Sequence, residues 1–419
     1  MLDLKREEIE IMSPVGSFET LVAAIQGGAD AVYFGIGTLN MRSRSTINFT
    51  LGDLEEIIRV TREHGVKTYM TINTVVYDNE IAEMKKLVDA AKKHDIDAII
   101  ASDQSVLLYA REKGVEIHLS TQVNISNVEA LRFYANFADV VVLARELNLT
   151  QVKHIFDTIE KEQIKGPSGN LIKIELFSHG ALCMAISGKC YLSLHEFNYP
   201  ANRGQCLQTC RRGYEVKDLE TGYKLEVDNE FIMSPKDLKT IHFLNKIIDA
   251  GVRVLKIEGR ARPPEYVKTV TRCYNEAVDA IIKGTYTLEK IKIWNNQLNT
   301  VFNRGFWDGY YLGQKLGEWN RDYGSKASKK KTYVAKTTNY FSKLGVGEFL
   351  IESGSLSIGD EILIIGPTTG VIEMTVREIR VAYKNVETAG KGESLSLPVP
   401  SQVRRADKLF KLVSTGEIN

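Results

Sequence analysis

Four of the five cysteines of this chain lie within one short stretch. They are Cys183, Cys190, Cys206 and Cys210. Six residues separate the first two, fifteen the second and third, and three the last two. Such a set can hold a structural zinc ion or an iron–sulfur cluster, because both prefer thiolate ligands. Only the last spacing is typical of a zinc knuckle, whereas the wider ones suit a cluster, whose corners lie farther apart than the ligands of one ion; spacing alone leaves both open.

The residues around these cysteines suit an anionic centre. Gly188 and Gly204 let the backbone approach a cluster closely and offer N–H groups to its sulfurs. Arg203, Arg211 and Arg212 add cations that stabilise thiolates or hold a carboxylate or phosphate. The alternative, a set of core cysteines without a metal, is disfavoured because the chain has only one other cysteine.

Other catalytic schemes have less support. His195-Glu196 begins like a zinc-protease helix, but the second histidine four residues on is missing. No GxSxG nucleophile motif is present. A cysteine nucleophile paired with His179, four residues before Cys183, stays open on sequence alone, although it leaves three cysteines unexplained.

The composition is that of an ordinary globular protein. The 54 Lys and Arg residues nearly balance the 53 Asp and Glu residues, so a nucleic-acid partner needs a local basic patch. No apolar run is long enough to span a bilayer, and the first residues, MLDLKREEIE, lack an apolar signal core. We therefore expect a cytoplasmic protein that does not bind membranes, with cysteines used for metal or redox chemistry rather than disulfides.

The elements that position the cysteines repeat one pattern, a short strand followed by an amphipathic helix. The predicted strands are residues 9–13, 31–36, 67–73, 98–102, 116–120, 140–144, 173–178 and 253–258. Eight such units with short connections predict an α/β fold, a TIM-like (β/α)8 barrel. The alternative is an open doubly wound sheet, whose nucleotide-binding form is disfavoured because the first turns lack GxGxxG.

The seventh unit carries the cysteines in an oversized loop, a large insertion at about residues 179–252. Active sites of such barrels lie at the carboxyl ends of the strands and in the loops that follow them. Polar residues follow the predicted strands at Asn73, Gln122, Arg145, His179 and Glu258. We expect them to mark the mouth of a pocket.

The last part of the chain changes character. Residues 1–323 form the predicted barrel with its insertion and a helical extension, and residues 324–331, small and lysine-rich, are predicted to be a linker. Residues 332–419 contain short β runs and turns, which predict a small antiparallel β-barrel. The string SGSLSIGDEILIIGP resembles the second domain of translation factors, a module often set against RNA.

One motif connects the chain to a known family. Glu175-x-Phe177-x-x-Gly180-Ala181-Leu182-Cys183-x4-Gly188-x-Cys190-x-Leu192-Ser193 matches the signature of the collagenase-like peptidase family of unknown catalytic type. The opening SPVGSFETLVAAIQGGADAVYFG is similar to that family's first strand–helix unit. The resemblance covers the barrel and, in longer members, the C-terminal domain.

The family name implies proteolysis, but the resemblance also implies hydroxylation chemistry. Several members resemble hydroxylases with a 4Fe-4S cluster on four cysteines, which implies Cys183, Cys190, Cys206 and Cys210 as ligands here. One branch hydroxylates tRNA wobble uridine to 5-hydroxyuridine with prephenate, another a ribosomal cytidine, and a third acts in anaerobic ubiquinone synthesis. The appended β domain and its lysine-rich linker favour an RNA substrate. We therefore predict a tRNA uridine hydroxylase that also uses an electron donor.

The remaining site assignments follow from charge and position. His179 and Glu258 are the catalytic candidates. The candidates for substrate binding, with the arginines assigned to carboxylates of prephenate, are Arg42, Arg44, Asn73, Gln122, Arg145 and Arg203. A collagenase-like peptidase is the first alternative function. The second is a zinc-stabilised RNA-binding module without catalysis.

Overall fold

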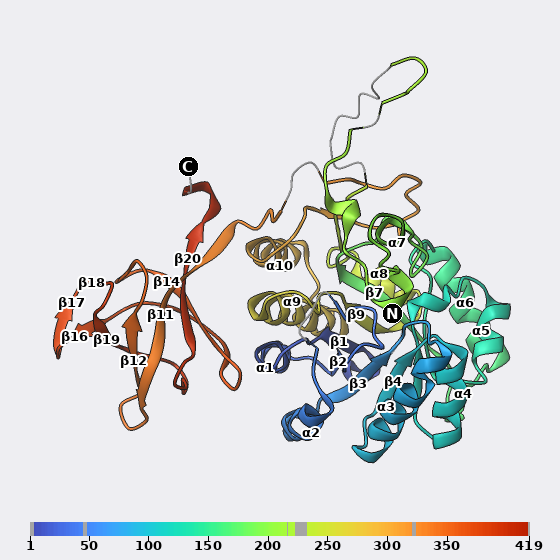
Figure 1. Cartoon of the computed structure of the whole chain (residues 1–419), viewed down its shortest axis with the longest axis horizontal. Coiled ribbons are helices and arrows are strands. Elements are labelled where there is room, and N and C mark those ends of the chain that lie inside the picture. The colour runs from blue at the N-terminus through green and yellow to red at the C-terminus, as the bar shows by residue number, and fades with distance from the viewer. Residues whose placement is uncertain (1–3, 45–47, 216, 223–232, 321–323, 418–419) are drawn as a thin grey trace.

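The first part of the chain is a closed barrel. The computed structural model describes residues 4–44, 48–215, 217–222, 233–320 and 324–417. The eight barrel strands are β1 (Glu10–Pro14), β2 (Ala31–Gly35), β3 (Lys67–Ile72), β4 (Ala98–Ala101), β5 (Ile117–Leu119), β6 (Val140–Val142), β7 (Lys173–Gly180) and β9 (Val252–Ile257). Neighbouring strands pair in parallel, and β9 pairs with both β7 and β1, which closes the ring (Figure 1). The predicted TIM-like barrel is confirmed, and the open sheet is excluded.

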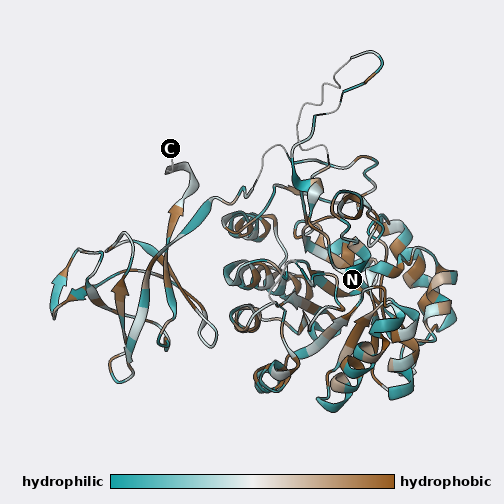
Figure 2. Cartoon of the chain, viewed as in Figure 1, coloured by the Kyte–Doolittle hydropathy of each residue, from teal (hydrophilic) through white to brown (hydrophobic). Residues whose placement is uncertain are grey.

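Helices follow the strands and cover the outside of the barrel (Figure 1). They are α1 (Phe18–Gln26), α2 (Leu54–Glu63), α3 (Ile81–Lys93), α4 (Gln104–Lys113), α5 (Val128–Tyr134), α6 (Leu149–Glu162), α8 (Leu244–Asp249) and α9 (Pro264–Ile282). In α2 the buried residues Leu54, Ile57, Ile58 and Thr61 recur at helical spacing, so one face packs on the strands. Figure 2 shows this pattern around the barrel, with apolar strands inside and polar outer helix faces.

Side chains alternate between the two faces of the barrel wall. Met12, Tyr33, Tyr69, Ile100 and Val254 belong to a cluster inside the barrel, separate from the larger apolar layer between strands and helices. Because all eight strands run in parallel, their carboxyl ends lie at one rim. The loops that carry the expected site residues therefore meet at that rim.

The insertion between β7 and β9 contains little regular structure. It holds α7 (Leu192–Phe197), two three-residue turns at Ala201–Arg203 and Thr209–Arg211, and β8 (Asp237–Lys239), which pairs antiparallel with β7. Residues 216 and 223–232 of the insertion lie outside the described residues. After the barrel, α10 (Leu288–Thr300) is followed by β10 (Phe306–Trp307), which pairs with β8.

The C-terminal part is an antiparallel β domain. Its larger sheet contains β11 (Lys329–Phe341), β12 (Val346–Ile351), β14 (Glu361–Gly366), β15 (Gly370–Thr375), β16 (Ile379–Val381), β17 (Lys384–Val386), β19 (Ser394–Pro398) and β20 (Lys408–Ser414). A second sheet pairs β13 (Ser355–Ser357) with β18 (Thr388–Gly390). The predicted linker at 324–331 is too long, because Lys329 to Lys331 already pair with β20.

The β domain packs against the barrel through α1 and α9. The Gln26 side chain donates to the Thr369 carbonyl at 2.9 Å and accepts from the Val371 N–H at 2.9 Å. Lys268 Nζ donates to the Val371 carbonyl at 2.8 Å. Hydrogen bonds to backbone groups on both sides of one turn fix where the β domain sits on the barrel.

Candidate functional site

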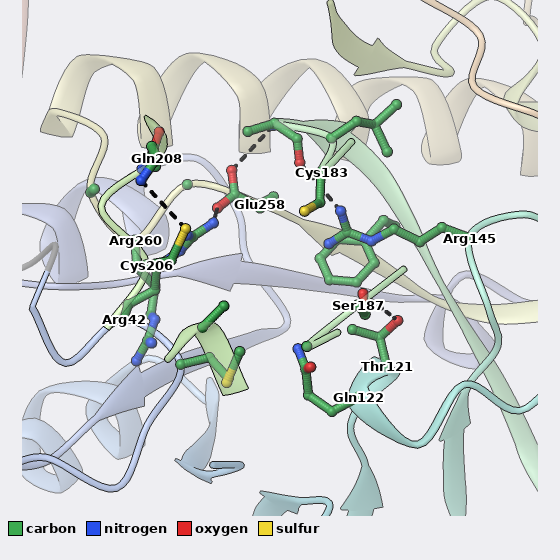
Figure 3. A pocket seen from close by; sticks show the side chains of 18 of the residues that line it. Arg42, Thr121, Gln122, Arg145, Cys183, Ser187, Cys206, Gln208, Glu258 and Arg260 are labelled. Atoms are coloured by element: carbon green, nitrogen blue, oxygen red, sulfur yellow. Dashed lines mark hydrogen bonds and ion pairs between the residues drawn. The ribbon is translucent and has the colours of Figure 1, made fainter. Parts of the chain in front are cut away.

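A cavity of about 420 Å³ opens where the carboxyl ends of the strands meet the insertion. Nine of the twelve expected site residues line it: Cys183, Cys190, Cys206, Cys210, Arg42, Asn73, Gln122, Arg145 and Glu258. Figure 3 shows Cys183, Cys206, Arg145 and Glu258 turned toward the same space. The insertion therefore forms one wall of this cavity and the barrel forms the other.

The four cysteines of the insertion are free thiols. Burial raises the pKa of Cys210 to about 11; Arg211 opposes this rise, and the neighbouring Cys183, Cys206 and Cys190 add to it. Burial also raises the pKa of Cys190, and Cys183 and Cys206 contribute. The thiols are thus close enough to disfavour one another's ionisation. A metal centre would offset this mutual repulsion, because metal ions bind thiolates and deprotonate coordinating thiols.

The thiol arrangement bears on the kind of metal centre that fits. In the described residues no group of three or more His, Cys, Asp or Glu side chains is close enough to hold one metal ion. Ligands of a four-iron cluster bind separate corners and lie farther apart, so four free thiols around one cavity fit the donor set of such a cluster.

Two glycines hold the cysteine loops against the barrel. Gly188 has φ +76°, and a Cβ there would lie 1.9 Å from Gln122 Oε1. Gly204 has φ +74°, and a Cβ there would lie 2.1 Å from the Asn40 carbonyl oxygen. Both positions need glycine for conformation and for space. A larger residue at Gly204 would push its loop off the Asn40 backbone, whereas at Gly188 the flexible Gln122 side chain can move and the positive φ is the stronger constraint.

Glu258, which follows β9, links the two walls. Its Oε1 lies 2.7 Å from Arg42 Nη2, and its Oε2 accepts from the Ala181 N–H at 3.1 Å. Burial alone would raise the pKa of Glu258, but Arg42, Arg262 and Arg145 outweigh burial and lower it to about 2. The carboxylate is ionised at neutral pH and is a weak base. Its geometry is that of a group that positions the insertion.

The structure places His179 behind the cavity wall. It is 1% exposed and is not among the residues that line the cavity. Its Nδ1 lies 3.4 Å from the Tyr274 hydroxyl, and its ring contacts Tyr266 and Phe306. Burial, with Lys239 and Arg262, lowers the pKa of His179 to about 3. A neutral, enclosed imidazole at this position does not reach a substrate in the cavity.

Two further arginines expected in the site also lie outside the cavity wall. Arg203 forms a bidentate ion pair with Glu80, with one N–O distance of 2.7 Å, and stacks over the Tyr77 ring at 3.8 Å. Arg44 stacks over the Tyr199 ring at 4.0 Å. The expected roles of Arg203 and Arg44 in substrate binding therefore receive no support from their positions.

Cations dominate the cavity, and four of them, Lys256, Arg260, Arg262 and Arg304, were not expected from the sequence. Seven line it: Arg42, Arg145, Arg211, Lys256, Arg260, Arg262 and Arg304. Glu258 pairs with Arg42, Glu175 pairs with Lys256 at 2.7 Å, and Asp237 lies 3.4 Å from both Arg262 and Arg304. The other three arginines, Arg145, Arg211 and Arg260, make no ion pair with a carboxylate in the described part of the chain. Arg260 and Arg262 could have been predicted from the sequence, because the basic run Gly259-Arg260-Ala261-Arg262 directly follows the last barrel strand.

Arg260 is a buried cation of the cavity whose hydrogen-bond partners are neutral. It is 6% exposed and donates to Asn40 Oδ1 at 2.8 Å and Thr71 Oγ1 at 3.1 Å, both neutral acceptors. Burial lowers the pKa of Arg260 to about 10. A buried cation without a counter-charge is costly, and an anionic ligand offsets that cost. The cavity therefore suits a small molecule with more than one negative charge.

Comparison with known proteins gives one family and two kinds of activity among relatives. Residues 16–321 match the family model described as peptidase family U32. A collagenase of Porphyromonas gingivalis is 63% identical over 96% of this chain and 98% of its own length. A tRNA hydroxylation protein of Bacillus subtilis is 32% identical over 88% of this chain and 86% of its own length. A 23S rRNA 5-hydroxycytidine synthase of Escherichia coli is 33% identical over 76% of this chain and 47% of its own length.

Proposed function

The chain belongs to peptidase family U32, and we propose that it is an RNA-hydroxylating enzyme rather than a peptidase. The specific proposal is hydroxylation of wobble uridine to 5-hydroxyuridine in tRNA. Prephenate is the proposed co-substrate, and a 4Fe-4S cluster on Cys183, Cys190, Cys206 and Cys210 is the proposed cofactor. Two relatives named for RNA hydroxylation support the reaction class.

One observation carries the proposal, the shared cavity of four free thiols and seven cations. With the four cysteines counted as neutral thiols, the three carboxylates next to these cations leave an excess of four positive charges, part of which an anionic cluster on the cysteines would offset. Prephenate is a small acid with two carboxylates, so it complements this excess, and a cavity of about 420 Å³ is within the range for such ligands. A peptide backbone is neutral and gains nothing from the excess charge.

The described residues suggest a division of roles. Arg145, Arg211 and Arg260, which have no carboxylate partner in the described chain, bind the acidic groups of the co-substrate. Glu258 stays ionised, holds Arg42 and accepts from the Ala181 N–H, and so keeps the insertion in place. A cluster bound to the four thiols would supply one-electron transfer. The target uridine must leave its stack to place carbon 5 at this cavity.

The peptidase alternative rests on the name of the family and on three relatives, two named collagenase at 63% and 57% identity and one named uncharacterized protease at 36% identity. Peptide hydrolysis requires an activated nucleophile and a base near neutral pKa, or a metal-activated water. In the described residues no histidine lines the cavity, and Glu258, whose pKa is about 2, is its one carboxylate. The cavity is therefore better suited to binding acids than to cleaving peptides.

An assay of the purified protein separates the two functions. Protein prepared without oxygen is incubated with tRNA lacking 5-hydroxyuridine and with prephenate as the source of the oxygen atom, in parallel with and without a chemical electron acceptor or donor, and the nucleosides are measured by mass spectrometry. We expect brown protein, formation of 5-hydroxyuridine, and loss of both on Cys210→Ser substitution. Colourless protein that cleaves gelatin, with cleavage surviving substitution of all four cysteines, would establish the peptidase instead.

A further inference from the structure

The floor of the cavity contains a buried ion pair between two barrel strands. In the β7–β9 register Phe177 lies opposite Lys256, and Glu175 lies two residues earlier, opposite Val254, on the same strand face. Lys256 Nζ is 2.7 Å from Glu175 Oε1, and the two side chains are 7% and 0% exposed. Lys256 lines the cavity, whereas Glu175 lies behind it. The carboxylate therefore supports the ammonium group from below.

Aromatic rings hold the same cation and a second one. Lys256 Nζ lies 4.7 Å from the centroid of the Tyr33 ring and 5.6 Å from that of Phe177. The guanidinium of Arg145 lies 3.8 Å from the centroid of Phe177. Cations are attracted to such ring faces, most strongly where water is excluded. Phe177 thus fixes two neighbouring cations of the cavity wall.

Polar atoms in this group lack partners. Arg145 Nε and Glu175 Oε2 are both buried and have no hydrogen-bond partner among the residues that the structure describes. Within the same residues Arg145 makes a long hydrogen bond, 3.4 Å to the Ala181 carbonyl. Buried donors are nearly always satisfied, and a guanidinium can bind a carboxylate with two parallel bonds. Because Arg145 Nε is enclosed, a ligand in the cavity reaches Arg145 through its Nη groups, of which Nη1 makes that long hydrogen bond.

We propose that Lys256 and Arg145 form a subsite for one carboxylate of a small acid, with Glu175 and Phe177 as the residues that position them. The inference rests on the proposed function and deepens it, because the acid is the co-substrate of that reaction. A small acid fits better than an RNA phosphate, since Lys256 is 5% exposed at the floor of the cavity and a polymer backbone does not reach it. The strand β7, which leads into the cysteine-bearing insertion, thus also carries the two residues that position the subsite.

Binding measurements on the full-length, cluster-loaded protein test the subsite. Calorimetric titration uses prephenate, phenylpyruvate and inorganic phosphate as probes. Lys256→Met alone leaves Glu175 buried without a counter-charge and can impair folding, so the main variant is Lys256→Met with Glu175→Gln. The matched control replaces the exposed pair Lys153–Asp157, whose N–O distance is 2.8 Å, by Met and Asn.

We expect the main variant to keep its melting temperature within a few degrees and to weaken prephenate binding by roughly 10- to 100-fold, the range for a lost charged hydrogen bond. Phe177→Leu should weaken binding by roughly 3- to 10-fold through loss of the ring face, and Phe177→Tyr should restore it. The control variant, with Lys153→Met and Asp157→Asn, should bind prephenate with the affinity of the unmodified protein.

The outcomes separate this inference from the proposed function. Equal prephenate affinity in the unmodified protein and the main variant would overturn the subsite and leave the proposed function standing. Binding of phenylpyruvate but not prephenate, lost in the main variant, would support the subsite and contradict the proposed co-substrate. Tight binding of phosphate alone, or of none of the three probes, would overturn both.

Discussion

Substitution of Glu258 by glutamine gives the most quantitative test of how the cavity is held together. The carboxylate contacts Arg42 at 2.7 Å and the Ala181 N–H at 3.1 Å, and its pKa is lowered from 4.5 to about 2. A folded-state pKa below the unfolded value means that ionisation stabilises the folded state. The difference of about 2.5 pKa units corresponds to about 3 kcal/mol at pH 7. Glu258→Gln should lower the free energy of unfolding by that amount.

The sign of the pH dependence is fixed by the same shift. The stabilisation is fully present above the unfolded pKa of about 4.5 and is lost as the pH falls through about 2. The free energy of unfolding of Glu258→Gln should therefore be lower than that of the unmodified protein by about 3 kcal/mol at pH 7, but by only about 1.4 kcal/mol at pH 3.

Urea unfolding at pH 7 and pH 3 provides the measurement. The control is Glu63→Gln, because Glu63 pairs with Arg59 on the surface and its side chain is 54% exposed, so its loss should change stability little at either pH. An equal loss of stability at pH 7 and pH 3 for Glu258→Gln would refute the electrostatic reasoning. No loss at pH 7 would show that the link between Glu258 and Arg42 does not hold the cavity together.

Three further predictions concern single residues. Gly188→Ala should destabilise the fold by about 1 to 3 kcal/mol and lower the iron content of the purified protein, because alanine is strained at φ +76° and its Cβ displaces the Gln122 side chain from its place beside the cavity; thermal unfolding and iron analysis measure this, and Gly169→Ala, with open space around it at φ +82°, measures the cost of the strain alone. Arg260→Met should weaken prephenate binding at least roughly 10-fold in calorimetry without loss of stability, because the substitution removes a buried cation that lacks a carboxylate partner in the described chain; unchanged affinity would remove Arg260 from the binding residues. His179→Gln should retain 5-hydroxyuridine formation within a few-fold at saturating prephenate, and a loss of several hundred-fold in a stably folded variant would show that this enclosed histidine acts in the chemistry.

Most of the barrel could be predicted from sequence, for a physical reason. Parallel strands buried on both faces are continuous apolar runs, and all eight lie within two residues of their predicted positions. The β domain was recognised from its turns and short strands. Its start was placed too late, because Lys329, Lys330 and Lys331 indicate a solvated linker by composition, although they pair with β20 at the edge of the domain.

The site was predictable only where its signal is local in the chain. The cysteines carry a spacing pattern, and residues at strand ends such as Arg145 and Glu258 follow from the geometry of barrels. Lys256 was missed because it lies within an apolar strand and its partner, Glu175, is 81 residues earlier. His179 was expected at the mouth of the cavity but does not line it, because the β7–β9 register shifts between Phe177 and His179.

The central claim, hydroxylation of tRNA, is tested most directly by nucleoside mass spectrometry of tRNA from the source organism with the gene deleted. We predict that 5-hydroxyuridine and its derivatives at the wobble position disappear. They should return fully when the unmodified protein is supplied and to a lower level when the Lys256→Met, Glu175→Gln variant is supplied at equal abundance. Wobble 5-hydroxyuridine at an unchanged level in the deletion strain would contradict the claim.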